Sequence, residues 1–335
     1  MRKLQDLISV QQALELVPLD VKHKEFVENS KAIVREIFVW SSSKKLLLIG
    51  PCSIDFTKPV LEYAKFIKHL RDEFGDKLEI IMRFYTQKPR TTLGWKWFVY
   101  SHPWEDPNIN DWILRVRALA REIIDRFEVP LADELLYPEI TSRYRDVFSY
   151  VAVGARSTEN QLHREVISWL DIPSGFKNPT SWEIRPMVNS IIASRAPHVF
   201  VLWDAIWQSE WNPYTQWILR WWSQGPNYFR QHLMQSKKLM QEAGVLDGWV
   251  LIDVAHWNSQ KDISRVPQIV NYTLDYLQDV ELKDFFKWWM IESYLEEGNQ
   301  SIDTPTPIMG KSFTDPVISK DTTYELVKKI YEALN

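Results

Sequence analysis

The chain has 335 residues, of which 45% are hydrophobic and 25% are charged, and its formal net charge is −4. These values are typical of a soluble globular protein, and the acidic balance argues against a general affinity for nucleic acid or membrane surfaces. The charged residues 1–6 are unlike a signal peptide, and no apolar run approaches the ~18 residues of a membrane span. Because one cysteine excludes an internal disulfide, we expect a cytoplasmic protein.

Short apolar runs alternate with amphipathic stretches along most of the chain. Helical spacing of apolar residues predicts helices at 59–74, 110–127, 161–170, 186–195, 229–243 and 263–277. The strand candidates are 45–49, 78–85, 129–132, 151–153, 175–177, 198–202, 249–253 and 286–291. Eight strands with helices between them predict an α/β protein with a parallel sheet closed as a (β/α)8 TIM barrel.

Two segments fall outside this alternation. Residues 1–44 precede the first predicted strand and look helical, so we expect an N-terminal helical extension before a catalytic barrel of residues 45–335. Residues 203–227 are too long for a simple connection between a strand and a helix. An inserted hairpin or loop is therefore expected there, after the sixth strand.

Reactive side chains follow the predicted strands, where the active site of such a barrel is built. Nearly every strand end offers a charged or metal-capable group directly, and the sixth offers one through its insertion. In chain order these groups are Cys52, Arg83, Lys88, Glu134, Arg156, Lys177, Arg220, His256 and Glu292.

Six of the cations are expected to meet at one mouth of a protein that is acidic overall. They would repel one another unless an anion bound there, which predicts substrates that carry phosphate or carboxylate. The alternative is an ordinary solvated surface. The six are Arg83, Lys88, Arg90, Arg156, Lys177 and Arg220.

Cys52, His256, Glu292 and Asp315 form a second set. A thiolate, an imidazole and two carboxylates suit a divalent transition metal such as Mn, Fe, Co or Zn. Four protein ligands leave a position for a substrate oxygen only if the metal is five- or six-coordinate. This favours Mn or Fe over Zn, which is usually tetrahedral. The alternatives are a small buried cysteine and a core histidine, as is also expected of His163.

Eight motifs, taken together and in order, resemble one family over nearly the whole chain. It is the class I, microbial-type 3-deoxy-D-arabino-heptulosonate 7-phosphate (DAHP) synthases. Lys88-Pro89-Arg90-Thr91 separates this group from the related 8-phosphate octulosonate synthases. The motifs are Gly-Pro-Cys-Ser-Ile at 50–54, the run at 82–96, Gly-Ala-Arg-Ser-Thr-Glu at 154–159, Gly-Phe-Lys-Asn at 175–178, Ile-Leu-Arg at 218–220, Ile-Asp-Val-Ala-His at 252–256, Ile-Glu-Ser-Tyr at 291–294 and Gly-Lys-Ser-Phe-Thr-Asp at 310–315.

The resemblance implies the condensation of phosphoenolpyruvate with erythrose 4-phosphate and water to give DAHP and phosphate, the entry to the shikimate pathway and aromatic amino-acid synthesis. It also implies that a divalent metal is held by Cys52, His256, Glu292 and Asp315. The rival function is that of a non-catalytic relic that senses aromatic amino acids or serves assembly.

Substrate contacts are carried over in the same way. The phosphoenolpyruvate phosphate would meet Arg156, Lys177, Arg220 and the Ala155 backbone, and its carboxylate side would meet Arg83 and Lys88. Erythrose 4-phosphate would meet Lys88, Pro89, Arg90 and Thr91. Lys88 is the favoured proton donor, with a pKa expected to fall through burial among arginines, and Glu134 matches a family acid near the bound phosphate.

Residues 1–44 resemble the family's extension, which serves subunit contacts and feedback inhibition. A homodimer or homotetramer and an aromatic amino-acid inhibitor are therefore expected. Asp171 stands where feedback-sensitive members often carry serine, which leaves the identity of the inhibitor open.

The chain has seventeen tryptophans and ten glycines. Trp95 matches a family tryptophan, but Trp257 stands where the family has glycine or alanine. Our hypothesis is a gene that reads UGA as glycine, translated with a table that reads UGA as tryptophan. Some of these indoles should then lie at positive φ, on exposed turns, or beside Arg220. The family usually has glycine at Trp40, Trp97, Trp112, Trp169, Trp182, Trp207, Trp221, Trp222 and Trp288.

Overall fold

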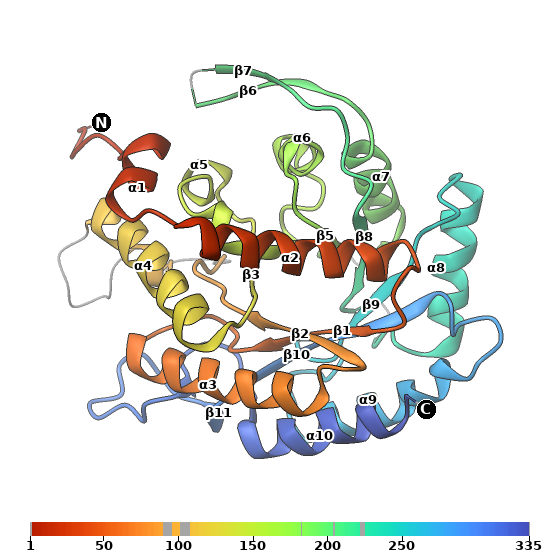
Figure 1. The fold of residues 1–335 in the computed structure, drawn as a ribbon. Helices are drawn as coiled ribbons and strands as arrows, with labels where there is room; N and C mark the ends of the chain where they lie inside the picture. Colours follow the sequence, from red (N-terminus) through yellow and green to blue (C-terminus); the bar gives the residue numbers. More distant parts are fainter. Residues whose placement is uncertain are drawn as a thin grey trace.

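A closed parallel barrel forms the centre of the molecule (Figure 1). The structure is a computed structural model, and it describes residues 2–89, 96–100, 108–181, 183–203, 205–221 and 225–334, except for the side chains of residues 287 and 288. Its strands follow the order β1-β2-β3-β4-β5-β8-β9-β10, and β10 pairs back onto β1. This confirms the predicted TIM barrel. The strands are β1 Lys45–Gly50, β2 Leu78–Arg83, β3 Leu131–Glu134, β4 Phe148–Val153, β5 Ser174–Lys177, β8 Thr215–Leu219, β9 Val250–Asp253 and β10 Phe286–Tyr294.

Helices cover the outside of the barrel, and the six predicted spans agree with the structure to within a few residues. Helix α3, Thr57–Phe74, shows why: Val60, Ile67 and Leu70 repeat at helical spacing and are all buried. Helix α10, Lys320–Glu332, was not predicted and packs beside α3 (Figure 1). The others are α4 Ile109–Phe127, α5 Pro138–Thr141, α6 Gln161–Trp169, α7 Arg185–Ser194, α8 Arg230–Glu242 and α9 Arg265–Leu274.

The extension forms two helices, α1 Val10–Leu16 and α2 Val21–Phe38, that precede β1. Ser9 and Asp20 cap them, each accepting a hydrogen bond from a backbone N–H of the first turn. Val34, Ile37 and Phe38 at the end of α2 join the core cluster that fills the barrel interior. Phe38 packs edge-on against Trp249, the residue before β9, with ring centroids 4.0 Å apart. Helix α2 therefore covers the N-terminal end of the barrel.

The sixth barrel strand lies later in the chain than predicted. The run at 198–202 contains β6, Val199–Leu202, which pairs antiparallel with β7, Ala205–Gln208, in a hairpin outside the barrel. Strand β8, inside the predicted insertion, takes the sixth place between β5 and β9. The hairpin therefore precedes the sixth strand instead of following it. The apolar run at 198–202 was wrongly predicted to be a barrel strand. Alternate residues of β6 face solvent, whereas every residue of β8 is buried, as a barrel strand requires.

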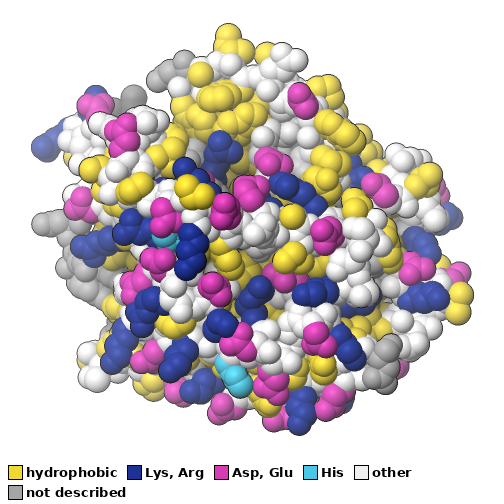
Figure 2. Space-filling view, in the orientation of Figure 1, with side chains coloured by type: hydrophobic (Ala, Val, Ile, Leu, Met, Phe, Trp, Pro, Cys, Tyr) yellow, Lys and Arg dark blue, Asp and Glu magenta, His cyan; other side chains and the backbone are white. Residues whose placement is uncertain are grey.

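The hairpin carries the apolar side chains Val199, Val201 and Ile206 on its exposed side. Figure 2 shows hydrophobic side chains gathered at the top of the molecule, where Figure 1 places β6 and β7. Elsewhere on this face, acidic and basic side chains are interspersed.

Among the described residues, no helix is long and apolar enough to span a bilayer.

Some tryptophans have the backbone expected of glycine. Trp40 and Trp97 lie at φ 67° and 86°, and Trp203 lies at φ 54°. Trp40 is on an exposed turn, but Trp97 is buried, as is Trp112 within α4. Positive φ at some of the named tryptophans is confirmed. Trp95, Trp182, Trp222 and the side chain of Trp288 lie outside the described residues.

Candidate active site

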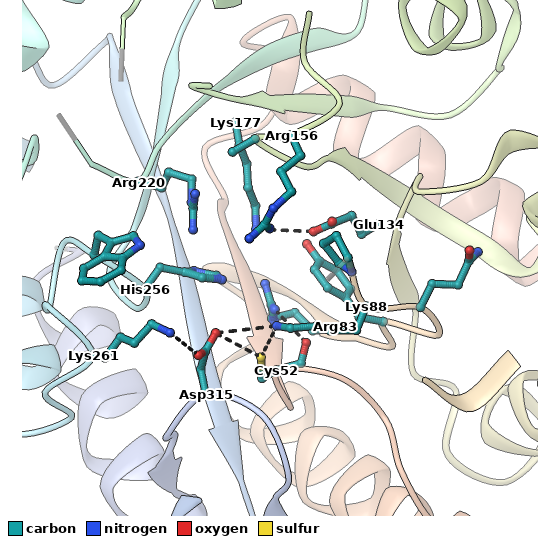
Figure 3. A pocket seen from close by; sticks show the side chains of 15 residues that line it. Cys52, Arg83, Lys88, Glu134, Arg156, Lys177, Arg220, His256, Lys261 and Asp315 are labelled. Atoms are coloured by element: carbon teal, nitrogen blue, oxygen red, sulfur yellow. Dashed lines mark hydrogen bonds and ion pairs between the residues drawn. The ribbon is translucent and has the colours of Figure 1, made fainter. Parts of the chain in front are cut away.

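A cavity of about 300 Å³ opens at the C-terminal ends of the barrel strands (Figure 3). Most of the side chains predicted from strand ends line it. Arg90 and Thr91 lie outside the described residues. The lining residues are Cys52, Arg83, Tyr85, Gln87, Lys88, Pro89, Glu134, Ala155, Arg156, Lys177, Arg220, His256, Trp257, Lys261 and Asp315.

Strand register explains why residues distant in sequence meet here. Arg83, Glu134 and Lys177 are the last residues of β2, β3 and β5, and Arg220 directly follows β8. Glu292, in β10, pairs in register with Gly50 at the end of β1. All these strand ends face one mouth because the strands are parallel.

Three of the four predicted metal ligands form a tight group. One ligand atom each of Cys52, Glu292 and Asp315 lies within 4.8 Å of the others. Atoms that share a metal at about 2.0–2.3 Å must lie at about this separation or closer. Among the described residues, Glu292 Oε2 is buried and has no hydrogen-bond partner, which leaves it available as a ligand atom.

His256, the fourth residue of this set, stands next to the group. Its Nε2 lies 3.3 Å from Glu292 Oε1, and its Nδ1 lies 2.7 Å from Asp253 Oδ2. A carboxylate at one ring nitrogen leaves the lone pair of the other for a metal. We name Cys52, His256, Glu292 and Asp315 the metal-capable cluster, whose donors fit a divalent transition metal.

Two lysines lie against this cluster. Lys88 Nζ is 2.8 Å from Cys52 Sγ and 3.6 Å from Asp315 Oδ2, while Lys261 Nζ is 2.7 Å from Asp315 Oδ1 (Figure 3). Sequence reasoning missed Lys261, which follows His256 by five residues on the same turn. Each ammonium group neutralises part of the cluster's negative charge.

The pKa values in the cluster follow from burial and these contacts. Burial, reinforced by Glu292, raises the pKa of Cys52 to about 11, so the thiol must lose a proton to bind a metal. Burial alone would lower the pKa of Lys88, but Cys52 and Asp315 outweigh burial and raise it. The expected fall in the Lys88 pKa is therefore wrong, because the Cys52 sulfur and the Asp315 carboxylate lie beside its ammonium group and favour its protonated form.

Arg156, Lys177 and Arg220 line the other part of the cavity, which we name the anion half. Lys177 Nζ lies 3.8 Å from Glu134 Oε2 and 3.6 Å from Asp253 Oδ2. Burial lowers the pKa of Lys177, and these carboxylates counteract the fall. The site thus holds a buried cation between two carboxylates, neither of which is within hydrogen-bond distance of it.

Gly154 lets β4 approach Glu134 closely. A Cβ at this position would stand 2.4 Å from Glu134 Oε1, closer than side-chain atoms tolerate. The carboxylate can therefore lie over the backbone and face Lys177. A side chain at residue 154 would therefore displace this carboxylate from its place beside Lys177.

Arg83 connects the strands beneath the cavity. Its Nη2 donates to Glu292 Oε1 at 2.9 Å, and its guanidinium carbon lies 4.0 Å from the centre of the Tyr85 ring. Both members of the pair are buried. Burial opposes the charge on Arg83, but its anionic neighbours raise its pKa, so the guanidinium stays charged.

Sequence reasoning also missed Asp253. Its signal was present: it ends a predicted strand and precedes His256 by three residues.

Trp257 lines the cavity, and its ring lies 5.6 Å from that of Trp221. The cavity stays open to Arg156, Lys177 and Arg220 beside these indoles.

Comparisons with known proteins identify the family of the chain. The sequence profile of the DAHP synthetase I family matches residues 25–328. The Tyr-sensitive phospho-2-dehydro-3-deoxyheptonate aldolase of Salmonella typhimurium is 34% identical over 340 residues, covering 99% of this chain and 94% of the relative. The Phe-sensitive enzyme of Escherichia coli K12 is 35% identical over 341 residues, covering 99% and 96%.

A solved structure gives the same result. The phospho-2-dehydro-3-deoxyheptonate aldolase of Francisella tularensis superposes with a TM-score of 0.94 at 29% identity, covering 100% of this chain and 98% of that one. Fold, sequence profile and full-length relatives coincide. The chain belongs to the DAHP synthetase I family.

Proposed function

We propose that the protein is a 3-deoxy-7-phosphoheptulonate synthase, a transferase that condenses phosphoenolpyruvate with erythrose 4-phosphate and water to give DAHP and phosphate. This reaction is the first step of the shikimate pathway. The observation that carries the proposal is one cavity that joins the metal-capable cluster to the three cations of the anion half. A substrate with a phosphate at one end and a reacting carbon at the other fits this arrangement.

Phosphoenolpyruvate is assigned to the anion half. Arg156, Lys177 and Arg220 would hold its phosphate together with the Ala155 backbone, since arginine suits bidentate contact with tetrahedral oxyanions. Its carboxylate would face Arg83 and Lys88. Erythrose 4-phosphate is assigned to the motif Lys88-Pro89-Arg90-Thr91.

The metal-capable cluster would bind a divalent ion, with Mn, Fe or Co favoured over Zn because its four protein ligands leave a substrate position only at higher coordination numbers. When bound, such an ion polarises the aldehyde as a Lewis acid. The chain supplies the rest of the chemistry: it fixes C3 of phosphoenolpyruvate against the aldehyde carbon and keeps the phosphate neutralised.

Lys88 is the proposed proton donor. Its ammonium group would lie between the two substrates as assigned, and its raised pKa keeps it protonated in the free protein. As the new C–C bond forms, Lys88 would give a proton to the former aldehyde oxygen. Water then adds at C2 and phosphate leaves, while Glu134 stays beside Lys177 at the phosphate end.

The test uses purified full-length protein loaded separately with Mn²⁺, Fe²⁺, Co²⁺ or Zn²⁺. We expect phosphate release that requires phosphoenolpyruvate, erythrose 4-phosphate and metal together, and that stops reversibly with a chelator. If aromatic amino acids bind but no metal supports turnover, the chain is the non-catalytic relic instead. The open cavity beside Trp257 favours the enzyme.

Regulation by an aromatic amino acid is assigned to a second cavity, of about 290 Å³, between the extension and the barrel. Helices α1 and α2 form one wall, and residues 142–146 and 171–172 form the other. Arg35 of α2 lies 2.7 Å from the Asp171 carboxylate, which connects the extension to this cavity. A homodimer or homotetramer is proposed with the extension at subunit contacts.

A further inference from the structure

Asp253 lies between the two halves of the cavity, at the end of β9, and is fully buried. Its Oδ2 is 2.7 Å from His256 Nδ1 and 3.6 Å from Lys177 Nζ. Its Oδ1 accepts a hydrogen bond from the Ala255 N–H at 3.1 Å. One carboxylate oxygen is therefore shared by the metal-capable cluster and the anion half, while the other oxygen fixes its orientation.

We propose that Asp253 is a positioning residue that orients His256 toward the metal-capable cluster and holds the Lys177 ammonium group in the anion half. The proposal rests on the assignment of His256 as a metal ligand. It adds to the proposed reaction a residue that touches neither substrate. Both halves of the cavity then depend on one carboxylate.

The geometry of His256 shows why it needs such a partner. Its backbone lies at φ 50°, a conformation that costs a non-glycine residue about 1–3 kcal/mol. The Asp253 carboxylate lies within ion-pair distance of Nδ1, although the two atoms are not aligned as a hydrogen bond. Its negative charge favours the tautomer with a proton at Nδ1, which leaves the lone pair on Nε2. That nitrogen is the one beside Glu292, at 3.3 Å from Oε1.

The surroundings of Lys177 supply the second argument. Its side chain is buried, and the nearest carboxylate oxygens are those of Asp253 and Glu134, at 3.6 and 3.8 Å. A buried ammonium group needs opposite charge close by. Asp253 lies at the end of β9 and Glu134 at the end of β3. The ammonium group of Lys177 therefore has carboxylates from two different strands close to it.

The first experiment titrates the metal-free protein with Co²⁺ and follows the absorbance of the bound ion. Asp253→Asn keeps the shape and removes the charge. We expect Co²⁺ affinity to fall about 10- to 100-fold, the usual effect of losing the partner of a metal-bound histidine, with altered cobalt bands. Thermal unfolding measured in parallel shows whether the variant is folded.

Asp133→Asn is the matched control. Asp133 is also a fully buried aspartate in a barrel strand, but its carboxylate accepts hydrogen bonds from Thr86 and the Glu134 N–H. Its Co²⁺ affinity should stay within about twofold of that of the wild type. Equal losses in both variants would show a general effect of buried charge and overturn the proposal.

His256→Ala separates this proposal from the assignment on which it rests. If His256→Ala leaves Co²⁺ affinity unchanged, His256 is not a ligand and the metal assignment fails. If His256→Ala weakens binding but a folded Asp253→Asn protein does not, the metal assignment stands and the role of Asp253 is wrong. Loss in both variants supports both.

The second experiment tests the Lys177 half with inorganic phosphate and metal-free protein. If Asp253 holds Lys177 in place, Asp253→Asn should bind phosphate several-fold more weakly. If Asp253 only repels the anion, its neutralisation should strengthen phosphate binding. Tighter or unchanged binding would therefore overturn this half of the proposal.

Discussion

The metal-capable cluster and the anion half carry opposite charges and are neutralised in opposite ways. Two lysines lie against the ligand atoms of the cluster, whereas two carboxylates surround Lys177. Each half therefore contains internal counter-ions: Lys261 would compete with a bound metal for Asp315, whereas Asp253 is proposed to hold Lys177 in place. Binding of a ligand in either half would replace an ion pair within the protein by a contact with the ligand. The effect of a substitution on affinity should therefore depend on whether the residue binds the ligand or pairs with a residue that does.

Removing a ligand group from the cluster should have the largest effect. Cys52→Ala deletes the buried thiol, and we expect the loss of metal-dependent DAHP formation together with a large loss of metal affinity. Product formation and bound metal per chain are the measurements. A variant that keeps full activity would show that the cysteine is only a small core residue.

Removing a ligand group from the anion half should have a smaller effect. Lys177→Ala should weaken phosphoenolpyruvate binding about 10- to 150-fold, because a hydrogen bond to a charged group contributes about 1.5–3 kcal/mol. The Michaelis constant for phosphoenolpyruvate and the affinity for inorganic phosphate should change together, while metal affinity stays near that of the wild type. Unchanged phosphate affinity would move the anion site elsewhere.

Removing a competitor should act in the opposite direction. Lys261 is 41% exposed at its side chain and pairs with Asp315 Oδ1, so it neutralises part of the carboxylate charge that would attract a metal. Lys261→Ala should therefore tighten Co²⁺ binding, by up to about fivefold for an exposed pair worth about 1 kcal/mol or less. Weaker binding would mean that Lys261 orders the loop more than it competes.

The tryptophans at the edge of the anion half provide a further test. Trp221→Gly should lower the Michaelis constant for phosphoenolpyruvate a few-fold by clearing the indole beside Trp257. Reading the gene tests the recoding hypothesis directly: the family-glycine positions should be UGA and Trp95 should be UGG. UGG at Trp40, Trp97 and Trp221 would contradict recoding, as would an active enzyme carrying the indoles at Trp221 and Trp222.

The last expected effect is on stability and not on ligand binding. Burial raises the pKa of Asp133 from 3.8 to about 7. The folded state thus holds this proton more tightly than the unfolded state, so the contribution to stability is full below pH ~4 and is lost as pH rises through ~7. Asp133→Asn should flatten the unfolding free energy over this interval, as measured by urea titration at several pH values.

The sequence was sufficient for the barrel and for most strand-end residues, because parallel strands place their C-terminal residues at one mouth. It failed at β6 and β8 because a short apolar run does not show whether both faces of a strand are covered. It failed for the pKa of Lys88 because the nearest charges come from Cys52 and Asp315, which are 263 residues apart. Such contacts depend on register that local patterns do not contain.

The seal that α2 makes at the far end of the barrel has a consequence for how regulation can be dissected. Deleting residues 1–44 would remove Val34, Ile37 and Phe38 and expose Trp249 and the interior beneath it to water. Such a truncated protein would report damaged folding instead of release from inhibition. Point changes at Arg35, which is half-buried in the same helix and pairs with Asp171, would test the proposed regulation without removing the residues that close the barrel.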